Sequence, residues 1–124
     1  FPENLKYTKD HEWIRIEGNE AYVGVTDFAQ SELGDIVYID LDCEGDSLDK
    51  EEVFGSVETT KTASDLFMPI SGTIVEINES LEDAPEMVNE SPYEEGWMIK
   101  IEIKDAAELN DLMDAAAYQA ITSA

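Results

Sequence analysis

Lys61 is the residue whose setting most suggests chemistry. No other Lys or Arg occurs between Lys50 and Lys100, and residues 62–99 contain nine Asp or Glu and no base. An isolated ammonium in such acidic surroundings has no evident structural partner, whereas a covalently attached cofactor needs a reachable, unpaired amine. The pattern therefore favours Lys61 as an attachment point, although spacing alone also fits a surface lysine with no role.

The residues beside Lys61 predict a tight turn between two strands. Strand-like runs at residues 52–58 and 63–68 flank it, and its neighbours are small: Thr59, Thr60, Thr62, Ala63 and Ser64. Small neighbours let several enzymes approach the amine. The amine should also be free of a salt bridge, because acylation removes its charge and would leave a buried acid partner unpaired. The turn thus meets the requirements for a carrier lysine.

Length and charge narrow the functional classes. The 124 residues, 43% of them hydrophobic, predict one globular domain that spans residues 1–124. A net charge of −23 argues against nucleic acid or an anionic membrane surface as a partner, because repulsion opposes contact. Cys43 is the only cysteine, which excludes an internal disulfide and is interpreted as an incidental thiol. We expect a reducing compartment, the bacterial cytoplasm or alternatively the mitochondrial matrix, and no membrane span.

The first half of the chain reads as short strands and one helix. Residues 13–16 and 21–25 predict a hairpin, and residues 26–34 predict a short helix with capping residues in front and Gly34 behind. Residues 35–41 are β-branched and apolar on both faces, which predicts a buried strand.

The second half continues this pattern and ends in a different period. Residues 73–77 predict a strand, followed by a helical turn near Leu81 and an irregular loop after Pro85. Residues 97–103 alternate, with Trp97, Ile99, Ile101 and Ile103 on one face and Met98, Lys100 and Glu102 on the other. One or two C-terminal helices then follow a capping box at residues 105–108, with one apolar face: Leu109, Leu112, Met113, Ala116 and Ala120.

The run FGSVETTKTASDL at residues 54–66, followed by PISG at residues 69–72, resembles the lipoyl-lysine hairpin of the glycine cleavage system H proteins. Further blocks resemble this family in the same order, which is more specific than the turn alone: residues 11–13, 23–30, 33–37, 78–86, 88–89, 92–93 and 96–97. The resemblance implies a mainly β, barrel-sandwich hybrid fold, like that of lipoyl and biotinyl carriers, with short peripheral helices and a C-terminal helix.

By this resemblance, Lys61 carries lipoate in amide linkage, attached by a lipoate ligase or lipoyltransferase. Glycine decarboxylase, a pyridoxal-phosphate enzyme, loads the aminomethyl group of glycine onto the lipoyl arm. An aminomethyltransferase passes the one-carbon unit to tetrahydrofolate, and dihydrolipoyl dehydrogenase reoxidises the dithiol. The chain itself is then a monomeric carrier and not an enzyme.

The resemblance also assigns residues to a cleft that protects the loaded arm. Glu12 is expected to bind the loaded amine, and Asp65 is expected to shape the turn or the mouth of the cleft. Glu32 stands where some family members have His, and we interpret it as an extra carboxylate for the ammonium. Thr60 and Thr62 replace the more usual Val and Ala beside the lysine, a change that keeps both neighbours small.

Three aromatic or imidazole side chains receive structural interpretations. His11, the only histidine, is expected at a strand edge with a local hydrogen bond. Trp13 and Trp97 are expected in the core or the cleft wall.

Three other functions stay open. A biotin carrier has a related hairpin, but its lysine usually lies between methionines and the blocks outside the hairpin have no place in it. The same fold could instead donate lipoate to other lipoyl domains. A third interpretation is an acidic interaction module with Lys61 unmodified. An enzyme is least favoured, because no catalytic triad, metal cluster or phosphate loop is visible.

Overall fold

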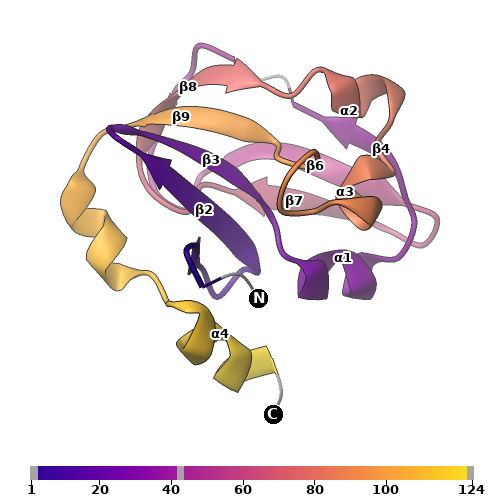
Figure 1. Cartoon of the computed structure of the whole chain (residues 1–124). Helices are drawn as coiled ribbons and strands as arrows, with labels where there is room; N and C mark the ends of the chain where they lie inside the picture. Colours follow the sequence, from indigo (N-terminus) through magenta and orange to yellow (C-terminus); the bar gives the residue numbers. More distant parts are fainter. Residues whose placement is uncertain (1–2, 42–43, 123–124) are drawn as a thin grey trace.

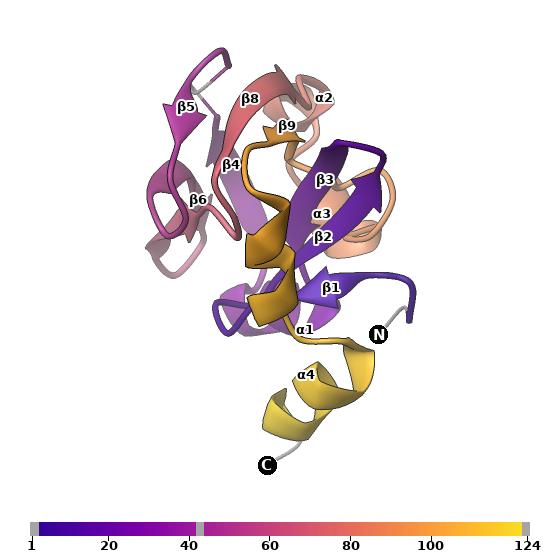
Figure 2. The ribbon, with the colours of Figure 1, turned by 90° about the vertical axis from the view of Figure 1, so that its left-hand side faces the viewer.

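The computed structural model describes residues 3–41 and 44–122, so the interpretation of Cys43 lies outside the described part. The fold is mainly β, as expected, with two antiparallel sheets facing one another (Figures 1 and 2). The large sheet has the order β1-β2-β3-β9-β8-β5, and the small sheet has the order β4-β6-β7. The strands are β1 Lys6–Tyr7, β2 Glu12–Glu17, β3 Glu20–Val25, β4 Ile36–Asp40, β5 Ser47–Leu48, β6 Val53–Thr59, β7 Ala63–Phe67, β8 Gly72–Ile77 and β9 Ile99–Ile103.

Both predicted hairpins are confirmed. In the first, β2 pairs with β3, with Ile14 opposite Val23. In the second, β6 pairs with β7, with Glu58 opposite Ala63, and the connecting turn carries Lys61. The turn therefore projects from two paired strands, a rigid base.

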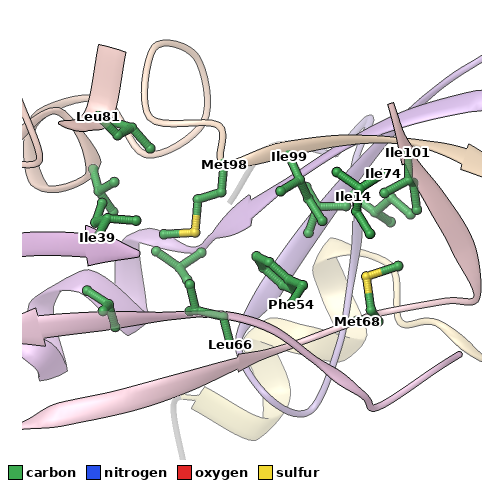
Figure 3. Packing of buried hydrophobic residues seen from close by; sticks show 14 of the residues in the cluster. Ile14, Ile39, Phe54, Leu66, Met68, Ile74, Leu81, Met98, Ile99 and Ile101 are labelled. Atoms are coloured by element: carbon green, nitrogen blue, oxygen red, sulfur yellow. The ribbon is translucent and has the colours of Figure 1, made fainter. Parts of the chain in front are cut away.

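The main core fills the space between the sheets (Figure 3). Met98 is wholly buried and points from the large sheet toward the small one. The prediction that Met98 lies on the opposite face of the strand from Ile99 is therefore wrong. The cause is that β9 begins at Ile99, one residue later, so strand alternation does not apply to Met98. Other buried members are Ile14, Val23, Val25, Ile36, Ile39, Phe54, Val57, Leu66, Met68, Ile70, Ile74, Leu81, Val88, Ile99 and Ile101.

Three short helices lie at the edges of the sheets. Helix α1, Asp27–Leu33, forms as predicted, with the Thr26 Oγ1 accepting from the Ala29 N–H at 3.1 Å. Helix α2, Ser80–Asp83, confirms the helical turn near Leu81. Helix α3, Met87–Glu90, occupies the segment expected to be an irregular loop. It forms because Val88 is buried in the core and anchors a single turn.

Strand β4 departs from its predicted burial. Val37 and Tyr38 are about half exposed, at 52% and 49%, while Ile36 and Ile39 are buried. The register with β6 shifts between Ile36 and Tyr38, so a bulge breaks the alternation and turns two successive side chains outward. The expectation of a strand buried on both faces is therefore wrong.

The C-terminal segment forms two helices, as expected. The predicted apolar face is confirmed for Leu109, Leu112 and Met113, which pack against the core clusters, but not for the rest of the segment. The 3-10 helix η1, Ala106–Asp111, precedes α4, Ala115–Thr122. Ala115 and Tyr118 are buried, whereas Ala116 and Ala120 of the predicted apolar face are exposed. The face shifts because Asp114 starts a new helix, its Oδ1 accepting from the Ala117 N–H at 2.8 Å, so the helical period does not run through from Leu109.

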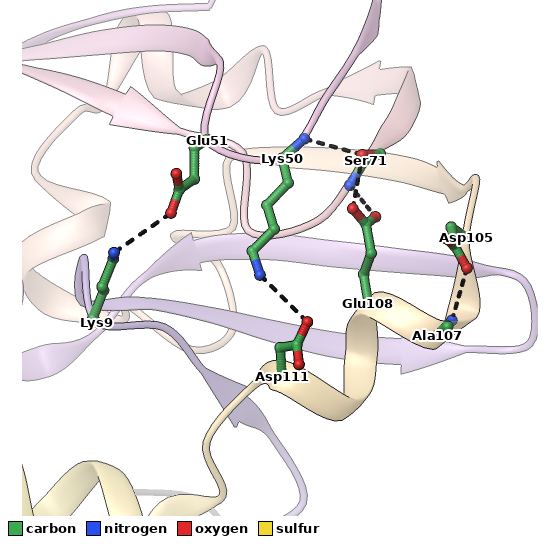
Figure 4. A network of polar contacts seen from close by, with 8 residues as sticks. All are labelled: Lys9, Lys50, Glu51, Ser71, Asp105, Ala107, Glu108 and Asp111. Atoms are coloured by element: carbon green, nitrogen blue, oxygen red, sulfur yellow. Dashed lines mark hydrogen bonds and ion pairs between the residues drawn. The ribbon is translucent and has the colours of Figure 1, made fainter.

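Half of the predicted capping box is present at the start of η1. Asp105 Oδ1 accepts from the Ala107 N–H at 3.0 Å. The Glu108 carboxylate does not turn back to the cap; it accepts from the Ser71 N–H at 2.8 Å and from the Ser71 hydroxyl at 3.1 Å (Figure 4). This contact ties the C-terminal segment to the turn that precedes β8. None of the helices in the described residues is both long and apolar enough to cross a membrane.

Candidate functional site

The turn that carries Lys61 is held by one threonine side chain. Thr59 Oγ1 accepts hydrogen bonds from the Lys61 N–H at 3.1 Å and the Thr62 N–H at 3.0 Å. The Thr59 N–H donates to the Thr62 carbonyl at 2.8 Å. The sequence predicts only that Thr59 is a small neighbour of Lys61. A threonine placed before two N–H groups of a tight turn is the signal that could have revealed its role.

Lys61 is exposed, and the end of its side chain lies close to Gly34, the residue that follows helix α1. A Cβ added at Gly34 would lie 3.9 Å from the Lys61 Nζ. The Thr60 N–H donates to the Asp35 carbonyl at 3.3 Å, which attaches the tip of the turn to the residue before β4. Within residues 3–41 and 44–122, no carboxylate forms a salt bridge with Lys61. The amine is therefore reachable and unpaired.

A cavity of about 460 Å³ lies alongside the β7 arm of the same hairpin. It brings together all three carboxylates assigned to a cleft, Glu12, Glu32 and Asp65. Its apolar lining comes from both sheets and from α1: Val25, Ala29, Leu33, Val57, Leu66 and Phe67. The cavity thus combines apolar walls with acid groups, a lining that suits a flexible hydrocarbon arm with a cationic end.

Glu12 is the buried acid of this cleft, with 2% of its surface exposed. Its Oε2 accepts from the Phe67 N–H at 2.9 Å, and its Oε1 accepts from the Thr8 hydroxyl at 3.4 Å. Burial raises the pKa of Glu12 from 4.5 to about 8, because these two hydrogen bonds only partly offset the loss of water and the nearby Asp10 opposes ionisation. Near neutral pH Glu12 therefore holds a proton that a bound cation would displace.

Glu32 and Asp65 differ from Glu12 because both are exposed. Glu32 lies in the last turn of α1, and Asp65 lies on β7 opposite Ser56. Both line the same cavity as Glu12. The cavity is therefore lined by one buried acid, Glu12, and by three exposed acidic residues, Asp10, Glu32 and Asp65.

His11 also lines the cavity, and its backbone N–H makes a local hydrogen bond, but the hydrogen bond of its ring is not local. Its Nδ1 lies 2.8 Å from the hydroxyl of Tyr118, a residue 107 positions away. Its backbone has φ of 66°, which turns the side chain out of the regular strand path. The local expectation fails for the ring because its partner comes from the C-terminal helix.

The two tryptophans take structural places. Trp13 is fully buried in a second core cluster, and its Nε1–H donates to the Pro92 carbonyl at 2.8 Å. Trp97 is half-buried with its ring edge-on to Tyr22, their centroids 5.2 Å apart. Neither lines the cavity beside Lys61. The interpretation of Trp13 as core is confirmed.

Asn89 supports the site from behind and was not identified from the sequence as a supporting residue. Its Oδ1 accepts from the Ile36 N–H at 3.0 Å, and its Nδ2–H donates to Gln30 Oε1 at 2.9 Å and to the Gly34 carbonyl at 2.8 Å. One side chain of α3 thereby joins α1 to β4, the two elements next to the lysine turn. Only the three-dimensional structure shows this role, because its partners lie more than 50 residues away.

The described residues contain no group of His, Cys, Asp or Glu arranged to hold a metal ion. The site instead offers an exposed amine on a rigid turn beside a cavity with apolar walls and acid groups. These features fit a covalently attached acyl arm that carries a cationic group.

Comparison with known proteins agrees with this chemistry. The family model "Glycine cleavage H-protein" matches residues 5–124. A glycine cleavage system H protein from Brevibacillus brevis is 56% identical over 121 residues, covering 98% of this chain and 96% of the relative. One from Bacteroides fragilis is 55% identical over 124 residues, covering 100% and 98%. The crystal structure of a glycine cleavage system H protein from Mycobacterium marinum superimposes with a TM-score of 0.88 at 34% identity, covering both chains fully. The chain therefore belongs to the glycine cleavage H-protein family, whose members are lipoyl carriers of the glycine cleavage system with lipoate bound covalently to a lysine.

Proposed function

We propose that Lys61 is the lysine to which lipoate is attached in this chain. The observation that carries the proposal is an exposed, unpaired amine on a turn held by Thr59, in the same hairpin whose β7 arm lines the acidic cavity. Once attached, lipoate supplies a disulfide that is reduced when a one-carbon amine is taken up and reoxidised later. The chain supplies the anchor, the shelter and the charge around it.

The cavity is the resting place of the arm. Its apolar walls would cover the hydrocarbon chain at about 0.8 kcal/mol for each methylene removed from water. Glu12 gives up its proton to the solvent and pairs with the cationic cargo, while Glu32 and Asp65 attract the same charge from the surface of the cleft. Exclusion of water around Glu12 slows hydrolysis of the cargo.

The same proposal extends to partners and organisation. Residues 1–124 act as a single carrier domain that performs no catalysis itself. Glycine decarboxylase, the tetrahydrofolate-dependent aminomethyltransferase and dihydrolipoyl dehydrogenase act on the arm in turn, after a lipoate ligase or lipoyltransferase has attached it. The net charge of −23 supports docking against basic surfaces of these enzymes. The bacterial relatives support a bacterial cytoplasmic setting.

The attachment site is tested by intact mass. The chain is expressed with a lipoate ligase, and wild type is compared with Lys61→Arg and with Lys104→Arg. Lys104 is an exposed lysine just after β9 of the large sheet. Wild type and Lys104→Arg should gain a lipoyl adduct, and Lys61→Arg should gain none. A biotin adduct, or no adduct on wild type, would refute the proposal. Glycine–bicarbonate exchange with glycine decarboxylase should then require Lys61, and retained exchange in Lys61→Arg would also contradict it.

A further inference from the structure

The C-terminal helix contacts His11, a residue of the cleft wall, through the side chain of Tyr118. This residue is fully buried, and its ring stacks on Tyr7 with centroids 4.8 Å apart and planes 7° from parallel. Its hydroxyl lies 2.8 Å from His11 Nδ1 and 2.7 Å from Thr26 Oγ1. Stacking fixes the ring, so the hydroxyl has a defined position between these two partners.

The first partner, His11, belongs to the wall that carries Glu12. The φ of His11 is 66°, in the left-handed region that residues other than glycine rarely adopt. Surrounding contacts must therefore maintain this conformation. The His11 N–H donates to the Thr8 carbonyl at 3.1 Å, and the Thr8 N–H donates to the Glu12 carbonyl at 2.9 Å. This tight turn leads directly into Glu12, so His11 and Glu12 belong to one short hydrogen-bonded segment.

The second partner, Thr26, directly follows strand β3, which pairs with the strand that begins after His11. Thr26 caps α1, whose residues Ala29, Glu32 and Leu33 line the cavity. The Thr26 N–H also donates to the His11 carbonyl at 3.0 Å. One hydroxyl from α4 therefore contacts two adjacent segments that support the cleft, the turn before Glu12 and the cap of α1.

We propose that Tyr118 is a positioning residue of the cleft, because its hydroxyl holds His11 and Thr26 and thereby sets the Glu12 carboxyl against the Phe67 N–H and the arm. This inference rests on the proposed function of the cleft. It assigns the C-terminal helix a role in sheltering the cargo, beyond covering the sheet.

The first test uses the unmodified chain. Tyr118→Phe keeps the stacked ring and removes the hydroxyl. Tyr93→Phe is the matched control, because the Tyr93 hydroxyl also bonds to the start of α1, where it accepts from the Asp27 N–H at 2.9 Å, but it has no hydrogen bond to His11 among the described residues. Amide hydrogen exchange of Phe67 reports the position of Glu12, since this N–H donates to its carboxyl.

In Tyr118→Phe the Phe67 amide should exchange roughly five-fold faster than in wild type, the effect of one hydrogen bond of ordinary strength. The core amide of Ile101, on β9, should exchange at its wild-type rate. His11 is the only histidine, so the nitrogen-15 shift of its Nδ1 is a single signal and should move as well. Tyr93→Phe should change neither readout. Equal acceleration of Phe67 and Ile101 would indicate general destabilisation and would overturn the proposal, as would an unchanged Phe67 rate.

The second test uses the lipoylated, loaded chain without partner enzymes and measures formaldehyde and ammonia released by hydrolysis of the cargo. Tyr118→Phe should hydrolyse roughly five-fold faster than wild type. In a Glu12→Gln background the same substitution should have no further effect, because Tyr118 acts through Glu12. The same ratio in both backgrounds would contradict this route.

A further variant keeps the proposal open to refutation if Tyr118→Phe does not fold. His11→Phe retains an aromatic ring against Phe28 and removes the partner of the Tyr118 hydroxyl. It should accelerate Phe67 exchange as Tyr118→Phe does, and an unchanged rate would overturn the inference. The lipoyl adduct is measured separately, so failure of attachment at Lys61 is distinguished from failure of the Tyr118 role.

Discussion

Replacing Glu12 by Gln should stabilise the fold, and by an amount that grows with pH. The glutamine side chain has the same shape and can still accept from the Phe67 N–H and donate to the Thr8 hydroxyl. The substitution removes only the ionisable group. In wild type the folded chain holds a proton on Glu12 up to a pKa of about 8, whereas the unfolded chain releases it near 4.5.

The sign follows from proton binding. Between these two pKa values the folded state binds more protons than the unfolded state, so the free energy of unfolding of wild type falls as pH rises. Each pH unit in this window is worth about 1.4 kcal/mol. At pH 7, about 2.5 units above the lower pKa, Glu12→Gln should therefore be more stable than wild type by at most about 3–4 kcal/mol. The difference should level off above about pH 8.

Urea unfolding followed by tryptophan fluorescence, from about pH 5 to about pH 8, measures this difference directly. Other carboxylates are common to both proteins and cancel in the comparison. Glu32→Gln is the matched control: it alters an exposed glutamate of the same cleft and should stay within about 0.5 kcal/mol of wild type. A difference between Glu12→Gln and wild type that does not change with pH would refute the assignment of a protonated Glu12.

Three further substitutions test how the site is supported. Thr59→Val should lower the free energy of unfolding by about 1–2 kcal/mol and speed amide exchange at Lys61, because two turn N–H groups lose their acceptor. Thr62→Val is the control, and equal amide exchange in both variants would contradict the role of Thr59. Asn89→Ala should cost about 2–3 kcal/mol in urea unfolding, because it leaves a partly buried N–H and a carbonyl unpaired, and a loss below about 0.5 kcal/mol would argue against it. Gly55→Ala should cost at least about 2 kcal/mol, because its Cβ would lie 2.5 Å from the Asp40 carbonyl oxygen; an unchanged urea midpoint would show that β4 and β6 separate easily.

Local patterns predicted most of the elements because their causes are local. The alternation of residues 20–25, the threonine before α1 and the glycine after it all act within a few residues. The lysine turn was predicted for the same reason. The resemblance to the H-protein family added the residues of the cleft, and the structure places Glu12, Glu32 and Asp65 around one cavity.

The failures have long-range causes. Nothing near His11 in the sequence indicates that its partner is Tyr118, and nothing near Asn89 indicates that it reaches Gly34. The raised pKa of Glu12 depends on how deeply its carboxyl is buried, which a motif does not show. The bulge at Val37 depends on the pairing of β4 with β6, so the exposed pair of apolar residues was missed.

This bulge also affects how copies of the protein meet in solution. Strand β4 is the outer strand of the small sheet, and with Val37 and Tyr38 exposed a straight edge there would invite another chain to add a strand. The irregular step interrupts the row of N–H and C=O groups that such growth needs. We therefore expect this acidic protein to stay dispersed in concentrated solution. Its exposed apolar residues Val37 and Tyr38 can form transient contacts, but the edge of β4 is a poor template for fibre growth.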